Sequence, residues 1–356
     1  MYDIKKIINL NPFGYGKFSK NKIFNKYFNR LNQHHYKNCQ NFRQVCDGLG
    51  VKGGNKIKLQ NFPMLPINIF KSFDLLSVDR KKIVKKVFSS GTTGQQLSKI
   101  FLDKINSNNQ MRVLSKIVEN VLGKERLPMI IVDQDPRFTN KLRFNAKSAA
   151  ILGFSLFGKN HCYILDNKGN INLNLLKSFL KKFQKKKFII FGFTSQIYEH
   201  LLKRTNINLQ SYNCKNAILL HGGGWKKLEK FKISNFEFKK RLNKKLSIKN
   251  VCNYYGLVEQ TGSIFIEGKN CGYFHTSIFS DILIRDKDFK LLKKNERGLI
   301  QLFSLLPTSY PGHNILTEDI GELKGEDDCK CGLKGKYFLV HGRVKESEIR
   351  GCSDAR

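Results

Sequence analysis

Short apolar segments alternate with helical segments between residues 126 and 255, and this alternation limits the possible folds more than any other feature. Residues 146–157 form a small-residue helix, and residues 172–186 place leucines at helical spacing with lysines on the opposite side. Thr194, Ser195 and Gln196 are expected to cap a further helix. Because strands and helices alternate, we expect a largely parallel α/β sheet. The runs with the character of buried strands are 126–133, 161–166, 188–193 and 216–220.

The pattern changes after Tyr255, where apolar runs follow one another without long helices between them. Residues 263–266, 278–284 and 299–305 each have the length and composition of a strand. This part of the chain is therefore expected to form a smaller β-rich subdomain. No internal repeat is present in the sequence.

The chain carries 64 Lys and Arg residues against 28 Asp and Glu, a formal net charge of +36. This charge either serves an acidic partner or reflects an AT-rich coding composition, because Lys, Asn, Ile and Phe are all abundant. The lysines are spread along the chain without a basic tail, so nucleic acid is not expected as a partner. No apolar run reaches the roughly 18 residues of a membrane span, and residues 1–10 contain lysines but no sustained apolar core of the kind expected for a signal peptide. With nine cysteines, an odd number, these features predict a cytoplasmic protein with reduced thiols.

Residues 89–94 read Ser-Ser-Gly-Thr-Thr-Gly and follow an apolar segment that ends at Phe88. Glycine lets the backbone approach an anion closely, and successive N–H groups in such a turn form an anion site to which hydroxyls add donors. The Gly-Lys-Ser/Thr ending of the nucleotide loop of kinases and GTPases is absent. The segment is a candidate phosphate loop, and an ordinary surface loop is the alternative.

Three later motifs also occur where apolar strands end or where acids gather. Residues 221–225 read His-Gly-Gly-Gly-Trp, residues 253–259 read Asn-Tyr-Tyr-Gly-Leu-Val-Glu, and residues 317–319 read Thr-Glu-Asp. Ligands of α/β sheets bind at the carboxyl ends of strands, so these residues are candidates for binding. Each motif alone is also typical of a turn or of a solvated face.

The order of these motifs, followed by Gly342-Arg343, resembles the adenylate-forming superfamily, which includes acyl-CoA synthetases, luciferases and peptide-synthetase adenylation domains. Residues 221–226, 255–263 and 342–354 are most similar to the acyl-protein synthetase family, the synthetase component of the bacterial bioluminescence fatty acid reductase complex. The resemblance covers residues 60–356. It implies an α/β fold of the N-terminal adenylate-forming type, with parallel sheets and a smaller β-rich subdomain.

The resemblance also implies a domain plan without the full C-terminal domain of about 100 residues that larger members carry. That domain supplies a catalytic lysine, and here Lys99, Lys345 or Arg350 would have to substitute for it. The expected parts are an N-terminal helical or irregular region packed on the core (1–85), an α/β nucleotide- and acyl-binding core (86–260), a β-rich subdomain (261–340) and a truncated hinge with a cysteine tail (341–356).

By resemblance, the cofactors are ATP and Mg²⁺. Glu259 would bind Mg²⁺ with Thr93 nearby, because a carboxylate oxygen suits this hard cation. Asp319 would accept hydrogen bonds from the ribose hydroxyls. Arg343 would lie near the ribose or phosphate, where a guanidinium makes strong contacts. The residues implied to hold the nucleotide, some of which would also line the acyl pocket, are Ser89, Ser90, Gly91, Thr92, Thr93, Gly94, Gly222, Gly223, Gly224, Tyr255, Gly256, Asp319 and Arg343.

The family chemistry is an acid–thiol ligation that forms AMP. A carboxylic acid, expected to be a fatty acid, attacks ATP to give acyl-AMP and pyrophosphate, and Cys352 then takes the acyl group as a thioester. Lys99, Thr93 and Glu259 are the other expected catalytic residues. An acceptor reductase or an acyl carrier protein would receive the acyl group. The alternatives are a ligase that uses CoA as acceptor, and a non-catalytic basic binding protein on the same scaffold.

A second constellation consists of Cys271, His275, Cys329 and Cys331. Thiolate and imidazole together suit tetrahedral zinc. The Cys-x-Cys spacing is tighter than the usual gap of two to four residues. A structural zinc site and a set of reduced thiols in a turn-rich region therefore both stay open.

Overall fold

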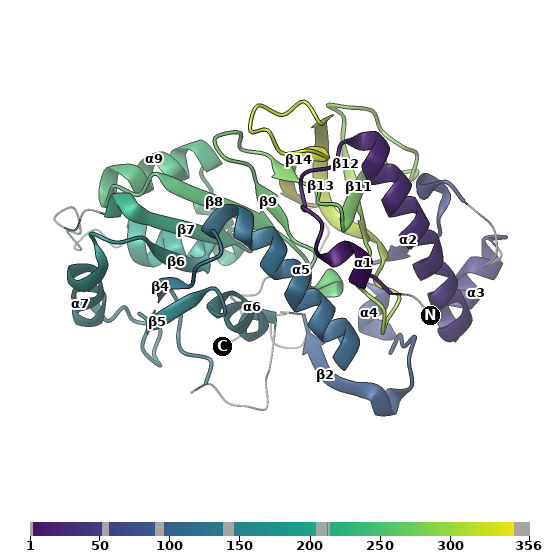
Figure 1. Ribbon diagram of the computed structural model, residues 1–356, viewed down its shortest axis with the longest axis horizontal. Helices are drawn as coiled ribbons and strands as arrows, with labels where there is room; N and C mark the ends of the chain where they lie inside the picture. The colour runs from purple at the N-terminus through teal and green to yellow at the C-terminus, as the bar shows by residue number, and fades with distance from the viewer. Residues whose placement is uncertain are drawn as a thin grey trace. The chain divides into compact units, whose positions relative to one another are not determined.

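A computed structural model of the chain describes residues 3–51, 57–89, 96–137, 146–203, 212 and 214–344. These residues separate into two compact units, both drawn in Figure 1. Within the described residues, unit 1 contains 3–51, 57–89, 96–117 and 256–344, and unit 2 contains the rest. Unit 1 is thus assembled from stretches that lie far apart in the sequence.

Unit 2 is built on a parallel sheet with the strand order β8-β7-β6-β4-β5. Every neighbouring pair in this sheet is parallel, which confirms the parallel α/β fold expected from the alternation. The strands are β4 (Leu127–Ile131), β5 (Gly158–Tyr163), β6 (Phe188–Phe193), β7 (Ala217–Gly222) and β8 (Asn250–Tyr255). β5 begins and ends three residues before the predicted run 161–166.

Helices cover both faces of this sheet, as Figure 1 shows. On one face, Leu180 of α7 (Leu173–Phe183) and Leu242 of α9 (Asn235–Leu246) join the buried cluster that contains Ile190 of β6. On the other face, Phe154 of α6 (Ala146–Ser155) packs 4.6 Å from the Phe191 ring. Successive residues of β6 therefore face opposite helix layers, as the two-residue period of a strand requires.

Local sequence explains where these helices begin. The Asn172 side chain accepts a hydrogen bond from the Leu175 N–H at 3.0 Å, and Ser234 caps α9 in the same way. Thr194, Ser195 and Gln196 do not cap the next helix, so that prediction was wrong. They form its first turn, α8 (Thr194–Ile197), which continues as η4 (Tyr198–Lys203). The remaining short helices of this unit are η5 (Cys214–Asn216) and η6 (Lys226–Phe231).

Unit 1 contains an antiparallel sheet with the order β11-β12-β13-β14-β10-β9, which confirms the predicted β-rich part. β1 adds to β13 in parallel, and β2 pairs with β3 in a separate hairpin. The strands are β1 (Leu65–Pro66), β2 (Ile83–Phe88), β3 (Lys99–Asp103), β9 (Phe265–Glu267), β10 (Phe274–His275), β11 (Ser280–Arg285), β12 (Arg297–Ser304), β13 (Asn314–Glu326) and β14 (Lys336–Arg343).

A long N-terminal helix, α2 (Lys17–Asn38), packs on this antiparallel sheet. The Phe28 ring lies 5.5 Å from the Phe303 ring of β12, and His35 lies 4.5 Å from His313. These contacts explain why the N-terminal region belongs to unit 1. The other helices of the unit are α1 (Lys5–Ile8), α3 (Gln40–Gly48), η1 (Leu59–Asn61), α4 (Ile69–Ser72), η2 (Arg80–Lys82), α5 (Lys104–Leu122, which ends in unit 2) and η7 (Val258–Gln260).

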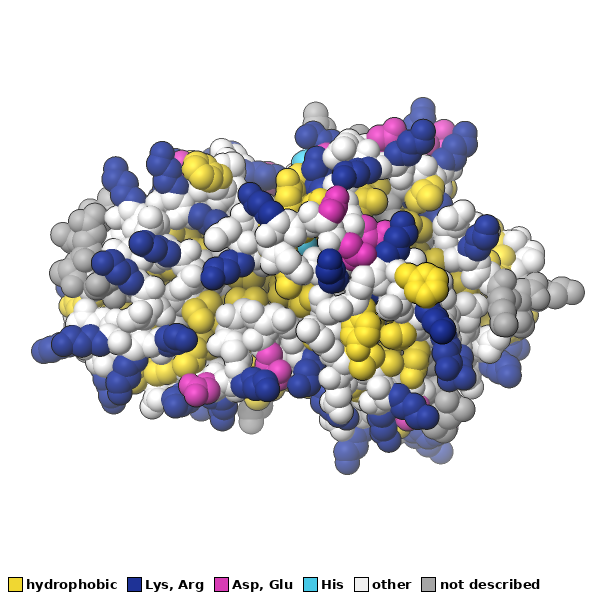
Figure 2. Space-filling view, turned by 45° about the horizontal axis from the view of Figure 1, so that its top comes forward, with side chains coloured by type: hydrophobic (Ala, Val, Ile, Leu, Met, Phe, Trp, Pro, Cys, Tyr) yellow, Lys and Arg dark blue, Asp and Glu magenta, His cyan; other side chains and the backbone are white. Residues whose placement is uncertain are grey.

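The basic side chains are dispersed on the face of the molecule that Figure 2 shows. On the face drawn in Figure 2, Lys and Arg are scattered among white and yellow atoms and do not gather into one patch. This distribution matches the even spread of lysines along the sequence. Among the helices formed by described residues, none has the length and apolar character needed to cross a membrane.

Candidate functional site

The acidic motif of residues 317–319 and the basic motif of residues 342–343 lie on neighbouring strands of unit 1. Asp319 on β13 is the register partner of Arg343 on β14, and the Arg343 Nε donates to Asp319 Oδ1 at 3.3 Å. Thr317 holds the backbone on one side, because its Oγ1 accepts the Asp319 N–H at 3.1 Å and donates to the Ile300 carbonyl. The Arg343 side chain is 30% exposed, so a ligand from solvent can reach its guanidinium group.

Glu259 lies in η7, on a backbone that is fixed from two directions. The Tyr310 hydroxyl donates to the Glu259 carbonyl at 2.9 Å, and burial raises the pKa of Tyr310, which keeps the hydroxyl protonated. A Cβ on Gly312 would lie 2.6 Å from the same carbonyl, so only glycine permits this approach. Glu259 is 3% exposed, and its carboxylate is an oxygen donor of the kind that Mg²⁺ prefers.

Two serines of unit 1, Ser89 and Ser98, are hydrogen-bonded to each other on either side of the predicted phosphate loop. Ser89 donates its N–H to the Ser98 carbonyl at 3.1 Å, and the Ser98 N–H donates to Ser89 Oγ at 2.9 Å. These serines continue the hairpin of β2 and β3, in which Phe88 pairs with Lys99. The loop residues themselves, Ser90, Gly91, Thr92, Thr93 and Gly94, lie outside the described residues, as do Lys345, Arg350 and Cys352.

Lys99 forms an ion pair at the start of β3. Its Nζ lies 2.8 Å from Asp74 Oδ1, and Arg80 contacts the other oxygen of the same carboxylate at 3.0 Å. Hydrogen bonds from Lys99 and Arg80 lower the pKa of Asp74. The ammonium group of Lys99 is thus paired with a carboxylate in this conformation, and its catalytic role stays a prediction.

The glycine-rich turn of unit 2 follows β7 and requires glycine at two positions for different reasons. A Cβ on Gly222 would lie 2.6 Å from the Tyr254 carbonyl, so a side chain would push β7 away from β8. Gly223 has φ +80° and a Cβ there would lie 2.8 Å from the Phe193 ring. Gly224 also has a positive φ, of +71°, but has open space around it. Tyr255 ends β8 in this unit, and Gly256 is the first residue of unit 1 after it.

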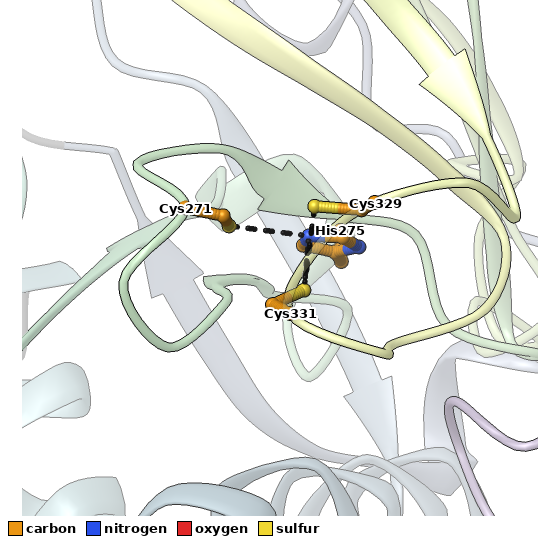
Figure 3. Close-up of side chains that lie close together, drawn as sticks. All are labelled: Cys271, His275, Cys329 and Cys331. Atoms are coloured by element: carbon orange, nitrogen blue, oxygen red, sulfur yellow. Dashed lines mark hydrogen bonds between the residues drawn. The ribbon is translucent and has the colours of Figure 1, made fainter.

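Four soft donor groups of unit 1 converge at the connections between its strands, as Figure 3 shows. Cys271 and His275 come from the β9–β10 segment, and Cys329 and Cys331 from the β13–β14 connection. Their donor atoms all lie within 4.8 Å of one another. Burial lowers the pKa of His275 to about 4, so the imidazole is neutral at physiological pH and can act as a ligand. Burial also raises the pKa of Cys271.

Comparison with protein families now adds to this geometry. Residues 3–356 match the family model described as "Acyl-protein synthetase, LuxE". The chain belongs to this family. One relative, the long-chain-fatty-acid–luciferin-component ligase of Vibrio harveyi, is 24% identical over 336 residues, which cover 90% of this chain and 84% of that protein. The ligase of the same name from Photorhabdus luminescens is 36% identical over 62 residues, 17% of this chain and 53% of that protein.

Solved structures show that this acyl-protein synthetase has the fold of adenylate-forming enzymes. An open conformation of 2-hydroxyisobutyryl-CoA ligase, determined with 2-HIB-AMP and CoA, superposes with a TM-score of 0.70 at 12% identity. The match covers 94% of this chain and 77% of that structure. The same ligase in its postadenylation state gives a TM-score of 0.68. The resemblance inferred from the motifs is therefore confirmed, and the family supports a ligase that activates an acyl group.

Sequence reasoning missed two polar contacts at strand ends of the acyl-protein synthetase. Thr194 Oγ1 donates to the Gly222 carbonyl at 3.1 Å and lies 2.9 Å from His221 Nδ1, so it contacts the first two residues of the glycine-rich motif. Burial lowers the pKa of His221 to about 3, which keeps this imidazole neutral. At the end of β4, Lys147 pairs with the buried Asp133 at 2.9 Å. The signal for Asp133 was an acid directly after an apolar run, whereas nothing in the sequence singled out Lys147.

Proposed function

We propose that this acyl-protein synthetase activates a fatty acid with ATP and transfers the acyl group to the thiol of Cys352. The family match over residues 3–356 supports acyl activation. The observation that contributes most from the structure is the Asp319–Arg343 pair, because it joins two separate family motifs on adjacent strands. Acid–thiol ligation with release of AMP is the specific reaction that we assign.

In the first step, an oxygen of the substrate carboxylate attacks the α-phosphorus of ATP. A P–O bond forms, the bond to the β-phosphate breaks, and pyrophosphate leaves with its electron pair. Asp319 accepts hydrogen bonds from the ribose hydroxyls, since a carboxylate accepts and does not donate. Arg343 offers charge-assisted hydrogen bonds to the ribose or phosphate oxygens. Positioning of the two reactants supplies much of the rate acceleration.

Glu259 is the proposed ligand of Mg²⁺, which would neutralise phosphate charge and favour departure of pyrophosphate. Its fixed backbone fits that role, because the Tyr310 hydrogen bond and the close approach of Gly312 limit its movement. Donors of the loop that starts at Ser89 would contact the β- and γ-phosphates, with Thr93 near the metal. The glycine-rich turn of residues 222–224 and Tyr255 would line the adenine and acyl sites.

In the second step, the Cys352 thiolate attacks the carbonyl carbon of acyl-AMP. A thioester C–S bond forms, the bond to the phosphate oxygen breaks, and AMP leaves. Thiolate is the strong nucleophile among common side chains, and nearby positive charge favours it over the thiol. An acceptor reductase or an acyl carrier protein then takes the acyl group from the thioester.

The test is acid-dependent exchange between ATP and labelled pyrophosphate, measured with short, long-chain and aromatic acids. We expect exchange with long-chain acids in the wild type and in Cys352→Ala, because adenylation precedes the thiol. Only the wild type should carry a labelled acyl group that survives denaturation and is released by hydroxylamine. Cys214→Ala provides the control, since that thiol is buried in unit 2.

Other outcomes separate the remaining functions. Label transferred to CoA at equal rates in wild type and Cys352→Ala would replace the acyl-protein assignment with a CoA ligase. Absence of exchange with every acid, together with tight and salt-sensitive binding of polyanions, would contradict adenylation and favour the binding-protein alternative.

A further inference from the structure

Three of the six separations among the four soft donors of unit 1 are close to those of a tetrahedral metal site, and all six lie within 4.8 Å. Metal–sulfur bonds of about 2.3 Å and metal–nitrogen bonds of about 2.0–2.1 Å give a tetrahedron with edges of roughly 3.5–3.8 Å. His275 Nε2 lies 3.6 Å from Cys271 Sγ and 3.3 Å from Cys331 Sγ. Cys331 Sγ lies 3.4 Å from Cys329 Sγ. The separation of the two sulfurs is well above the ~2.05 Å of a disulfide.

A glycine keeps the space among these donors open. A Cβ on Gly268 would lie 2.6 Å from Cys331 Sγ, 2.8 Å from Cys271 Sγ and 2.9 Å from His275 Nε2. One small volume beside Gly268 is therefore within bonding reach of three of the four donors. Gly268 and Cys271 belong to one turn, because the Cys271 N–H donates to the Gly268 carbonyl.

We infer that Cys271, His275, Cys329 and Cys331 bind one zinc ion, which joins the β9–β10 segment to the β13–β14 connection (Figure 3). Three sulfurs and one imidazole nitrogen favour zinc over magnesium or calcium, which take oxygen ligands. Four protein ligands complete a tetrahedron and leave no position for substrate. The ion is accordingly structural and takes no part in acyl activation.

The surrounding fold explains what the ion holds together. β10 has two residues and pairs with β14 only through Phe274↔Phe338 and His275↔Tyr337. Pairing this short gives little stability by itself. A metal bound by His275 of β10 and by two cysteines of the connection that leads into β14 would hold the two strands together.

The same connection also caps the N-terminus of α2. Asp327 follows β13, and its Oδ2 accepts the N–H of Lys17, the first residue of α2, at 2.6 Å. Its Oδ1 accepts the Gly335 N–H at 2.7 Å, so one carboxylate bridges the connection and the helix. Because Cys329 and Cys331 lie between Asp327 and Gly335, zinc binding would fix this cap in place.

The test measures zinc in the purified full-length chain by plasma emission and follows thermal unfolding with and without a strong chelator. We expect close to one zinc per chain and a chelator-induced drop in Tm of more than about 5 °C. Exchange of the zinc for cobalt should produce the visible absorption of tetrahedral cobalt with thiolate charge transfer, a readout that does not depend on activity.

Variants assign the ligands. Cys331→Ser should lower retained zinc at least ten-fold after dialysis, and Cys252→Ser, a buried cysteine of unit 2, should retain wild-type zinc. If Cys331→Ser fails to fold, release of zinc from the folded wild type by a mercurial reagent, followed with a colorimetric zinc dye, gives the same answer. Less than a tenth of a zinc per chain after growth with added zinc, with Tm unchanged by chelator, would overturn the inference. One iron per chain would overturn the zinc assignment.

Discussion

The β13–β14 hairpin carries two polar clusters of opposite character at its two ends. At one end, Asp319 and Arg343 form a hydrogen-bonded pair in which the arginine side chain is 30% exposed. At the other end, the connection contributes Cys329 and Cys331, and the partner residue His275 is 0% exposed. The partly exposed guanidinium of Arg343 can exchange partners with a ligand, whereas four converging soft donors around a small space suit a metal ion.

Both clusters lie on one hairpin, so the type of donor and its exposure decide whether a group suits ligand binding or structural support. Charged oxygen and nitrogen groups at a strand end suit a polyanionic nucleotide. Soft donors that are buried or half-buried suit a metal that stabilises the fold. The comparison predicts that changes at the cysteine end alter stability, and that changes at the Asp319 end alter nucleotide binding.

The largest effect is expected at Gly268. Gly268→Ala would place a Cβ among three of the donor atoms, and we expect it to reduce zinc affinity and to lower the free energy of unfolding by about 3–5 kcal/mol. Urea unfolding and metal analysis measure both quantities. Gly48→Ala is the control, because a Cβ there meets nothing within 4 Å. Full zinc content in Gly268→Ala with an unchanged urea midpoint would show that the space is not a metal site.

The second effect concerns a buried cation near the cysteine end. Lys20 of α2 donates to Thr276 at 2.7 Å, and burial lowers its pKa to about 8 from 10.5, although Asp281 opposes the shift. Between pH 8 and 10.5 the unfolded chain binds the proton and the folded chain does not, so stability contributed by this group rises with pH across that window. Below pH 8, burial of the charged Lys20 therefore lowers the free energy of unfolding by about 3 kcal/mol.

Lys20→Met removes this titration and tests the assignment. The free energy of unfolding of wild type relative to Lys20→Met should rise from pH 8 to pH 10.5, with no change in ATP binding. Chemical denaturation at several pH values measures the difference. Parallel pH profiles for the two proteins would mean that Lys20 has an ordinary pKa in the folded state.

The third effect belongs to the other end of the hairpin. Asp319→Asn removes the charge beside Arg343 and alters the proposed acceptor for the ribose hydroxyls, and a charged hydrogen bond is worth about 1.5–3 kcal/mol. We expect ATP affinity to fall roughly 10–100-fold by calorimetry, with zinc content and Tm retained. Glu318→Gln is the matched control on the same strand. An equal loss in both variants would remove the special role of Asp319.

The smallest effect is expected at the cap of α2. Asp327→Ala removes the acceptor for the Lys17 and Gly335 N–H groups and should lower the free energy of unfolding by about 1 kcal/mol. Glu125→Ala provides the control, since Glu125 is an exposed carboxylate of unit 2. A loss of zinc in Asp327→Ala would show that the cap and the metal site are coupled more tightly than the contacts require.

Much of unit 2 could be predicted because its information is local. A strand such as Phe188–Phe193 is apolar at every position, and Asn172 is a good N-cap, so both features can be recognised in a short window. The contact between Thr194 and the Gly222 carbonyl could not, because 28 residues separate the two groups. A threonine directly after a strand is a typical helix N-cap residue in sequence. Which group its hydroxyl contacts is decided by the neighbouring strand in the folded protein.

Unit 1 depends far more on distant pairings. β1 lies beside β13 through Leu65↔Ile315 and Pro66↔Leu316, which no periodicity in either segment indicates. Residues 1–85 were expected only to be helical or irregular and to pack on the core, whereas the structure shows that α2 packs on β12 of the antiparallel sheet. The expected parts 1–85 and 261–340 were continuous stretches of the sequence, the second marked by the change of pattern after Tyr255. The compact units follow contacts between strands, and so draw on separated stretches.

The sequence by itself determined the strand and helix alternation, the chemical types of the donors and the family, because periodicity and motif order are properties of neighbouring residues. The tertiary structure decided which of those residues meet. Asp319 reaches Arg343 through strand register, and Cys271 reaches Cys331 only because β10 pairs with β14. Long-range contacts of this kind depend on packing and register over the whole unit, which no local window of sequence records.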